Sequence, residues 1–413
     1  MYRSAIGVSL NGHKLEIAHE DTGWRGTASG IFMGYLYNLV LSTLAVNGGF
    51  MLEQERIMLL VTEKCNLKCN YCYEHQKSAR VMSFETAKNI LDAQLPKYNP
   101  ETPVVLEVFG GEPFANFELI RQIDSYLRDV YGHLTITYET TTNGTLVHGE
   151  IQDWLCEHKH KFFIALSLDG FKEMHNLNRI FADGTGSYDS IDIDFFAKTW
   201  PGCPAKLTIS QKTLPYMAEG IKYIHDLGFK CDATLSIGVD WNAEKNLPIL
   251  ASELNKLIDY YIENPDIPLC TMLNMDFRLV FTEFDEDYRF CGAGLDMTCY
   301  DAEGDAYPCQ GFAPVSIGEK SSVYRNYDQT KLRLTDENPC KMCRCLRLCP
   351  NCYAANLQST GDIQQVDPNL CRFFKYCILA SARIQFKRIL KKEQLTHDDQ
   401  LVLKAISLIQ KEI

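Results

Sequence analysis

The middle of the chain alternates short apolar runs with segments in which apolar residues recur every three or four positions. The runs have the length of buried strands and lie at 57–61, 104–109, 134–140, 162–168, 206–210 and 231–238. The helix-periodic segments follow them at 84–95, 117–131, 148–158, 187–199, 216–227 and 245–262. Six successive strand–helix units predict parallel strands joined by helical crossovers, and hence an α/β fold with a curved or barrel-like sheet.

Residues at the expected element ends support this assignment. Ser83 and Asn116 precede two of the helices and are of the type that caps a helix N-terminus with a side-chain oxygen. Pro96 and Gly132 follow the same two helices and end them. Because functional groups of a β/α barrel lie at the carboxyl ends of its strands, the residues that follow each apolar run are candidates for chemistry.

The N-terminal segment has a different pattern. Two apolar runs, at 5–10 and 15–18, flank Asn11-Gly12, which predicts a β-hairpin. A longer apolar stretch at 31–46 is interrupted by polar residues and is shorter than a bilayer-spanning run, so we expect a helix buried against the main domain.

Bulk composition restricts the class of function. The 413 residues are 46% hydrophobic and carry a formal charge of −12, as in a globular protein. General nucleic-acid binders and proteins of anionic membrane surfaces need a positive face, so neither partner is expected. Seventeen cysteines, with no secretory leader before them, favour a reducing compartment in which grouped thiols bind metals. We therefore expect a cytoplasmic protein.

Three cysteines follow the first buried run with the spacing C-x₃-C-x₂-C: Cys65, Cys69 and Cys72. Three thiolates suit an iron–sulfur cube, since each binds one iron and the fourth iron stays open to an outside ligand. A structural zinc ion would require a fourth protein ligand nearby, for which His75 is the local candidate. The residues alone leave both centres open.

This segment, with Tyr71 directly before the last cysteine, resembles the cluster motif of the radical S-adenosylmethionine (SAM) superfamily. The resemblance implies a partial (β/α)₆ barrel of TIM type, a [4Fe–4S] cluster on the three cysteines, and SAM bound to the open iron through its amino and carboxylate groups. Gly110-Gly111-Glu112-Pro113 resembles the family's SAM-amine site, with glycines that admit a close ligand and a carboxylate that accepts from an ammonium.

Two later strand ends complete the expected cofactor site. By the same resemblance Asn143, Ser167 and Arg179 hold the ribose and carboxylate of SAM, and a guanidinium suits a carboxylate because it pairs bidentately. The alternative is that these segments are only loop turns, since Asn143-Gly144 and Asp169-Gly170 are turn dipeptides.

The cysteine-rich end, from about residue 270, resembles the SPASM domain, which carries auxiliary clusters in radical SAM peptide maturases and anaerobic sulfatase-maturing enzymes. The family wiring implies two further [4Fe–4S] clusters, one on Cys291, Cys299, Cys309 and Cys352, the other on Cys340, Cys343, Cys349 and Cys371. The chain departs from the family in having two residues between Cys349 and Cys352 instead of three, and Cys299 is the ligand whose position varies most. Paired C-x₂-C spacing also suits a zinc ribbon.

These features divide the chain into four expected parts. An N-terminal hairpin and helix extension covers 1–55, the radical SAM partial barrel 56–265, the SPASM domain 266–377, and C-terminal helices 378–413. The first part is too short for the winged-helix leader-binding domain that many peptide-modifying relatives carry, since such a domain needs about 80 to 90 residues. A separate leader-binding protein is a candidate partner, and the mode of leader recognition stays open.

The resemblance implies a peptide maturase. A 5′-deoxyadenosyl radical would abstract hydrogen from a ribosomally made precursor peptide, an electron donor such as flavodoxin or ferredoxin would serve the clusters, and the product would carry a thioether or carbon–carbon cross-link. The alternatives are an anaerobic sulfatase-maturing enzyme, a peptide epimerase and a non-catalytic metal scaffold. The first ranks lower because Gln310 stands where that family has its basic aspartate, directly after Cys309. Cys231 and Cys345 are the candidate hydrogen-atom donors or acid/base groups.

Overall fold

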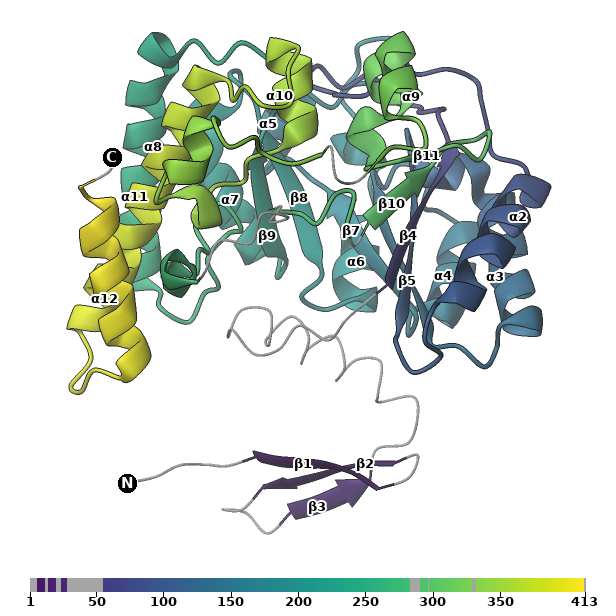
Figure 1. Cartoon of the computed structure of the whole chain (residues 1–413), viewed down its shortest axis with the longest axis horizontal. Helices are drawn as coiled ribbons and strands as arrows, with labels where there is room; N and C mark the ends of the chain where they lie inside the picture. The colour runs from purple at the N-terminus through teal and green to yellow at the C-terminus, as the bar shows by residue number, and fades with distance from the viewer. Residues whose placement is uncertain are drawn as a thin grey trace.

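An eight-stranded sheet organises the chain from Glu55 onward (Figure 1). The computed structural model describes residues 6–11, 14–19, 24–27, 55–282, 290–295, 297–328 and 332–411. The strands run in the order β11-β10-β4-β5-β6-β7-β8-β9, and β4 to β9 pair in parallel. These six are β4 (Glu55–Thr62), β5 (Val104–Gly110), β6 (Ile136–Thr142), β7 (Phe162–Ser167), β8 (Pro204–Ile209) and β9 (Lys230–Leu235). The predicted parallel α/β sheet is confirmed.

Helices follow the strands in turn and lie along the outer side of the sheet (Figure 1). They are α2 (Phe84–Gln94), α3 (Phe117–Val130), α4 (Glu150–His158), α5 (Lys172–Asn176), α6 (Ile193–Thr199), α7 (Met217–Asp226) and α8 (Ala243–Glu263). Strand residues such as Leu106 and Leu207 share one hydrophobic core with helix residues such as Ile120 and Ile221. The helical period in the sequence therefore marks the face that each helix turns to the sheet.

Two local predictions need correction. Asn116 occupies the N-cap position of α3, but its side chain does not cap the helix; its amide donates to the carbonyl of Val61 at 2.9 Å and ties α3 to the end of β4. The single helix expected over 187–199 is broken, because the Asp192 side chain accepts from the backbone N–H of Phe195 and starts α6 afresh. Ser83 caps α2 as predicted, accepting from the Thr86 N–H at 3.0 Å.

The N-terminal segment contains a separate three-stranded antiparallel sheet, formed by β1 (Ile6–Asn11), β2 (Lys14–His19) and β3 (Trp24–Thr27). The pairing of Asn11 with Lys14 confirms the predicted hairpin. The sequence did not indicate β3, which is short and lacks alternating apolar residues. The helix expected over 31–46 lies outside the described residues.

The cysteine-rich region packs directly against the first barrel strand. Met58 and Leu60, on one face of β4, lie in a hydrophobic cluster with Cys299, Tyr307 and other residues of this region, whereas Ile57 and Leu59 on the opposite face belong to the helix-side core. β10 (Met297–Tyr300) pairs in parallel with β4, and β11 (Ala306–Tyr307) pairs antiparallel with β10. Figure 1 shows these strands beside β4, with α9 (Pro314–Ile317) and α10 (Tyr353–Thr360) along the top of the view.

The C-terminal region packs against α8, the helix that follows the last parallel strand. α11 (Pro368–Leu390) packs along α8, with the rings of Trp241 and Phe373 4.8 Å apart and Arg383 Nη1 3.0 Å from Asn255 Oδ1. α12 (His397–Ile409) follows it. The domain boundary expected at 377/378 falls inside α11, because Asp367 caps this helix and Pro368 opens it.

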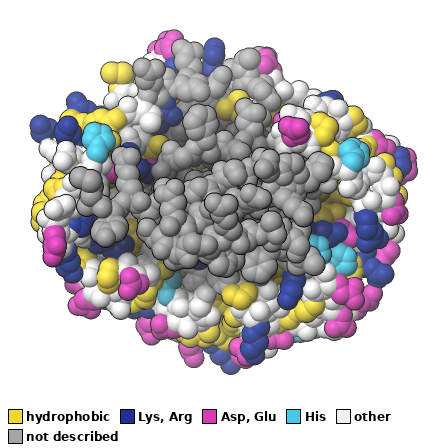
Figure 2. Space-filling model, turned by 90° about the horizontal axis from the view of Figure 1, so that it is seen from below, with side chains coloured by type: hydrophobic (Ala, Val, Ile, Leu, Met, Phe, Trp, Pro, Cys, Tyr) yellow, Lys and Arg dark blue, Asp and Glu magenta, His cyan; other side chains and the backbone are white. Residues whose placement is uncertain are grey.

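Charged side chains of both signs are present on the surface. The face in Figure 2 mixes Lys and Arg with Asp and Glu around its rim, so its described part presents no extended basic patch. Within the described ranges, every helix is too short or too polar to cross a bilayer.

Candidate active site

The loop after β4 carries the cysteine triad and is fixed by backbone pairing on both sides. Thr62 bridges to Val81, and Leu67 bridges to Phe181. The backbone N–H of Lys68 donates to the Ile180 carbonyl at 2.7 Å. Cys65, Cys69 and Cys72 therefore lie on a rigid loop at the carboxyl end of the first parallel strand, pinned to the segment that follows β7 and α5.

The three thiols are half-buried, and those of Cys65 and Cys72 accept hydrogen bonds. The Leu67 N–H donates to Cys65 Sγ at 3.4 Å, and Lys77 Nζ donates to Cys72 Sγ at 3.0 Å. Burial raises the pKa of the Cys65 thiol to about 11 and also raises that of Cys69. The Cys65 and Cys69 thiols therefore stay protonated near neutral pH unless a metal binds, since a coordinated thiol is deprotonated.

The triad supplies three sulfur donors, the number that an iron–sulfur cube with one open iron takes. Zinc needs four donors about 2.0 to 2.3 Å from a single centre. A cube binds each thiolate to a different iron and keeps the sulfurs farther apart. His75, the fourth ligand that zinc would have used, is exposed.

Gly110 and Gly111 bring the end of β5 against the cluster loop. A Cβ on Gly110 would lie 2.3 Å from the Thr62 carbonyl oxygen, and one on Gly111 would lie 2.5 Å from that of Lys64. The N–H groups of Gly111 and Glu112 donate to the same two carbonyls at 3.0 and 2.9 Å. We expected these glycines to admit a ligand, but their close contact is with the backbone that carries the triad.

Glu112 is buried between the ends of β5 and β6. Its carboxylate accepts from the Phe114 N–H at 3.2 Å, the Thr142 hydroxyl at 2.7 Å and the Asn143 N–H at 2.8 Å. Burial raises its pKa to about 7, although these three donors oppose the shift. The carboxylate thus joins the Gly-Gly-Glu segment to the segment that follows β6, two of the stretches expected to surround SAM.

Asn143 continues this connection to the triad loop. Its amide nitrogen donates to Asn66 Oδ1 at 2.9 Å, while its own oxygen accepts from the Thr145 hydroxyl at 2.7 Å. Asn66 Nδ2 donates in turn to that hydroxyl at 2.7 Å. The sequence analysis missed Asn66 and Thr145, because neither residue type signals a site without knowledge of which loops meet.

A buried carboxylate, Asp169, organises the opposite side of the loop. It accepts a hydrogen bond from the Tyr71 hydroxyl and another from the Thr208 N–H at 2.9 Å. Arg179 Nε lies 3.1 Å from Asp169 Oδ1, and the guanidinium sits 5.5 Å from the centre of the Tyr71 ring. Arg179 was expected to pair with the SAM carboxylate; its partner in the chain is Asp169, which the sequence analysis treated as part of a turn.

Ser167 ends β7 beside this group and is buried. Among the described residues its hydroxyl makes no hydrogen bond, so it is free to meet a ligand. The expected SAM-site residues Tyr71, Glu112, Asn143, Ser167 and Arg179 therefore lie at the carboxyl ends of adjacent parallel strands or on the loop that they support.

The cysteines of the C-terminal region form two groups. Burial and the nearby thiols of Cys352 and Cys291 raise the pKa of Cys309, and the buried thiol of Cys299 interacts with Cys309. In the second group, burial and then the thiols of Cys371, Cys340 and Cys343 raise the pKa of Cys349 to about 12. Cysteines within each expected set thus interact with one another, and their roles as cluster ligands stay predictions.

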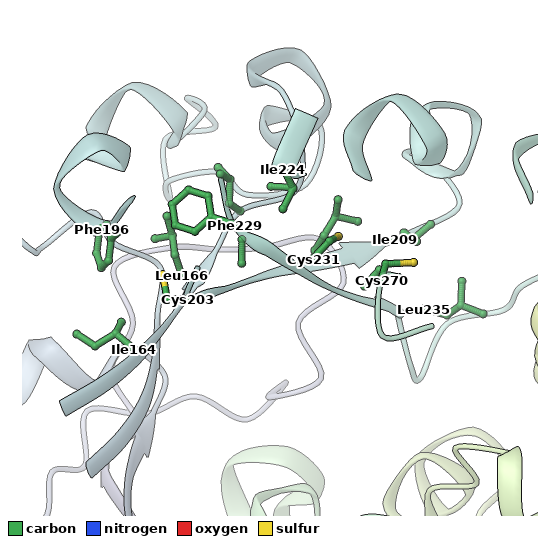
Figure 3. Close-up of a cluster of buried hydrophobic side chains, with 14 of the residues drawn as sticks. Ile164, Leu166, Phe196, Cys203, Ile209, Ile224, Phe229, Cys231, Leu235 and Cys270 are labelled. Carbon is green, nitrogen blue, oxygen red and sulfur yellow. The ribbon is translucent and has the colours of Figure 1, made fainter. Parts of the chain in front are cut away.

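The two candidate catalytic cysteines lie in hydrophobic surroundings. Cys231 is buried on β9 in the core that contains Ile224 and Phe229, and Figure 3 shows it among these side chains near Cys270. Cys345 is buried in the cluster that contains Phe277 and Ile378, and its thiol also contacts Cys343 of the second cysteine group. Both thiols are buried, and their catalytic role stays a prediction.

Comparison with known proteins agrees with this geometry. A family model for the radical SAM superfamily matches residues 59–193, which include the triad and Arg179. An uncharacterised protein of Methanocaldococcus jannaschii is 32% identical over 263 residues, covering 59% of this chain and 87% of that protein. A cysteine-type anaerobic sulfatase-maturating enzyme of Clostridium perfringens is 24% identical over 347 residues, 76% of this chain and 93% of the enzyme. The radical SAM cyclopropyl synthase TigE of Paramaledivibacter caminithermalis is 24% identical over 359 residues, 78% of this chain and 72% of TigE.

Solved structures share the fold. Native anSMEcpe with bound AdoMet superposes with a TM-score of 0.63 at 20% identity, covering 82% of this chain and 98% of that one. Streptococcus suis SuiB bound to the precursor peptide SuiA superposes with a TM-score of 0.53 at 16% identity, covering 82% and 80%. The parallel sheet, the triad loop at its carboxyl edge and these relatives lead to one conclusion: the chain belongs to the radical SAM superfamily.

Proposed function

We propose that this protein is a SPASM-type maturase that modifies a ribosomally made precursor peptide by hydrogen abstraction and installs a thioether or carbon–carbon cross-link. The observation that carries the proposal is the cysteine-rich region packed against β4, where Cys299 and Cys309 share a hydrophobic cluster with Met58 and Leu60. A radical SAM barrel alone would not need this region. It adds thiolates for two more metal centres next to the strand that carries the triad loop.

The proposed cofactors are SAM and three [4Fe–4S] clusters. Cys65, Cys69 and Cys72 would hold the first cluster, and the two C-terminal groups would hold one each. When bound, the first cluster and SAM supply one-electron reductive cleavage of SAM to a 5′-deoxyadenosyl radical. The protein's share is to place SAM: Glu112, Asn143 and the Asp169–Arg179 pair position the loops around it, and Ser167 offers a free hydroxyl.

A peptide substrate is supported by relatives of the same fold. SuiB was solved with its precursor peptide SuiA, and anSMEcpe with AdoMet and a peptide named Kp18Cys. We extend that substrate class to this chain. A one-electron donor such as flavodoxin or ferredoxin, a separate leader-binding protein, a cytoplasmic location and the four-part domain division belong to the same proposal.

The residue after Cys309 bears on the bond that is formed. Gln310 cannot take up a proton, and its side-chain oxygen is buried without a hydrogen-bond partner among the described residues. Formylglycine formation requires a base at this point, by the family resemblance, so cross-linking is favoured over sulfatase maturation. The relative TigE is named as a cyclopropyl synthase, which agrees with carbon–carbon bond formation on a related chain.

Co-expression with the small peptide encoded beside the gene tests the proposal. The peptide should lose two hydrogen atoms for each cross-link, as read by mass spectrometry, and the Cys69→Ala variant should leave its mass unchanged. A mass change corresponding to formylglycine would establish the sulfatase-maturing alternative. An unchanged mass with the unaltered enzyme, together with inverted stereochemistry at one residue, would establish epimerisation.

A further inference from the structure

Lys77 places a cationic group in contact with a sulfur of the triad. Its Nζ lies 3.0 Å from Cys72 Sγ, a distance typical of a charge-assisted hydrogen bond to sulfur. The ammonium also lies within electrostatic range of Cys65 and Glu74. Lys77 is five residues beyond Cys72, outside the cluster motif, so the motif itself does not require it.

Hydrogen bonds hold the residues on both sides of Lys77, so the position of this lysine in the loop is defined. On one side the Gln76 N–H donates to the Val315 carbonyl in α9 at 2.9 Å. On the other side the Ser78 hydroxyl donates to the buried Glu63 carboxylate at 2.6 Å.

We propose that Lys77 sets the reduction potential of the triad's cluster by donating a hydrogen bond to the Cys72 thiolate. The inference rests on the proposed function, since it presupposes that a cluster binds there. Hydrogen bonds to cluster sulfurs and nearby charge are among the factors that tune such potentials. One-electron reduction adds a negative charge to the cluster, and a fixed ammonium stabilises that reduced state. Removing the ammonium therefore makes the midpoint potential more negative.

The experiment is a redox titration of the reconstituted, full-length protein with dithionite as the one-electron reductant, followed by electron paramagnetic resonance. The signal that shifts on adding SAM identifies the first cluster among the three. Loss of one charge-assisted hydrogen bond in Lys77→Met should lower the equilibrium constant for reduction about tenfold, which is about 59 mV for one electron.

Lys68→Met is the matched control, because it removes the same charge from an exposed side chain inside the triad loop. The midpoint potential of Lys68→Met should differ from that of the unaltered protein by only a small fraction of the Lys77→Met shift. If Lys77→Met fails to hold the cluster, Lys77→Gln replaces it, with the same direction expected because a neutral amide donates a weaker hydrogen bond.

An unchanged midpoint in these variants, or an equal shift in Lys68→Met, would overturn the role of Lys77 and leave the proposed function standing. An unaltered protein that forms no SAM-responsive iron–sulfur signal would refute the proposed function itself. The two failures are therefore distinct.

Discussion

Replacing Asp169 with asparagine should destabilise the protein strongly, although Asp169 lies outside the cysteine motif. The carboxylate is fully buried and faces the buried guanidinium of Arg179 at 3.1 Å, besides accepting from the Tyr71 hydroxyl and the Thr208 N–H. Asparagine has nearly the same shape and keeps an acceptor, but it leaves Arg179 as an unpaired buried cation. Breaking a buried ion pair in this way costs about 3 to 5 kcal/mol.

Urea denaturation of the anaerobically reconstituted protein, followed by tryptophan fluorescence, measures this loss. Asp194→Asn is the matched control, because Asp194 is a largely exposed aspartate whose partner is Lys198. An exposed pair of this kind contributes about 0 to 1 kcal/mol, so the control should scarcely change the free energy of unfolding. The double variant Asp169→Asn with Arg179→Met should recover part of the loss, since it removes the unpaired charge. If Asp169→Asn lowers the free energy of unfolding no more than Asp194→Asn does, then Asp169 does not hold these groups together as we infer.

Three further predictions concern single sites. Burial raises the pKa of Glu112 in the folded protein to about 7, from an ordinary value of 4.5. Because the folded pKa is the higher one, the protonated carboxyl stabilises the folded state fully below about pH 4.5. That stabilisation is lost as the pH rises to about 7. The free energy of unfolding of the unaltered protein relative to Glu112→Gln should fall over that window, by up to about 3 kcal/mol, and stay constant above it; a flat difference would contradict the pKa. Cys231→Val replaces a buried core thiol with a side chain of similar size and should lower the free energy of unfolding by less than about 1.5 kcal/mol. SAM cleavage should stay unchanged, and loss of cleavage would indicate a catalytic role for Cys231. Cys309→Ala should lower the iron content by about four per chain while SAM cleavage continues, and full iron content would remove Cys309 from the cluster ligands.

The sequence predicted the framework well because the barrel repeats one simple unit. Buried parallel strands appear as continuous apolar runs, and the helices between them show a 3.6-residue period, so all six parallel strands could be located. The break in the helix over 187–199 was missed because Asp192 can cap a new helix or simply sit in an exposed turn, and only the packing of Phe196 in the core decides between them.

The candidate site was predictable only in part. Cysteine spacing indicates candidate metal ligands because the chemistry requires the ligands themselves, and several thiols of each expected set interact with one another. The residues that join loops gave no such signal. Asp169 and Asn66 act through partners distant in the chain, Tyr71 and Asn143, and such contacts depend on which strand ends adjoin.

Gly110 and Gly111 illustrate the same limit. Their position after a strand indicated a close approach, and the structure shows that the approaching group is the carbonyl backbone of the triad loop. The sequence indicates that no side chain fits at these two positions, but it does not indicate which neighbouring group excludes one.

The central claim is that Cys69 and its two companions hold a cluster that cleaves SAM. The most direct test is the yield of 5′-deoxyadenosine when SAM and dithionite are added anaerobically to the reconstituted protein. Unaltered protein and the Cys156→Ala control, which changes an exposed cysteine on α4, should both form 5′-deoxyadenosine with about 12 irons per chain. Cys69→Ala should form none and bind about four fewer irons. Continued SAM cleavage by Cys69→Ala would contradict the account.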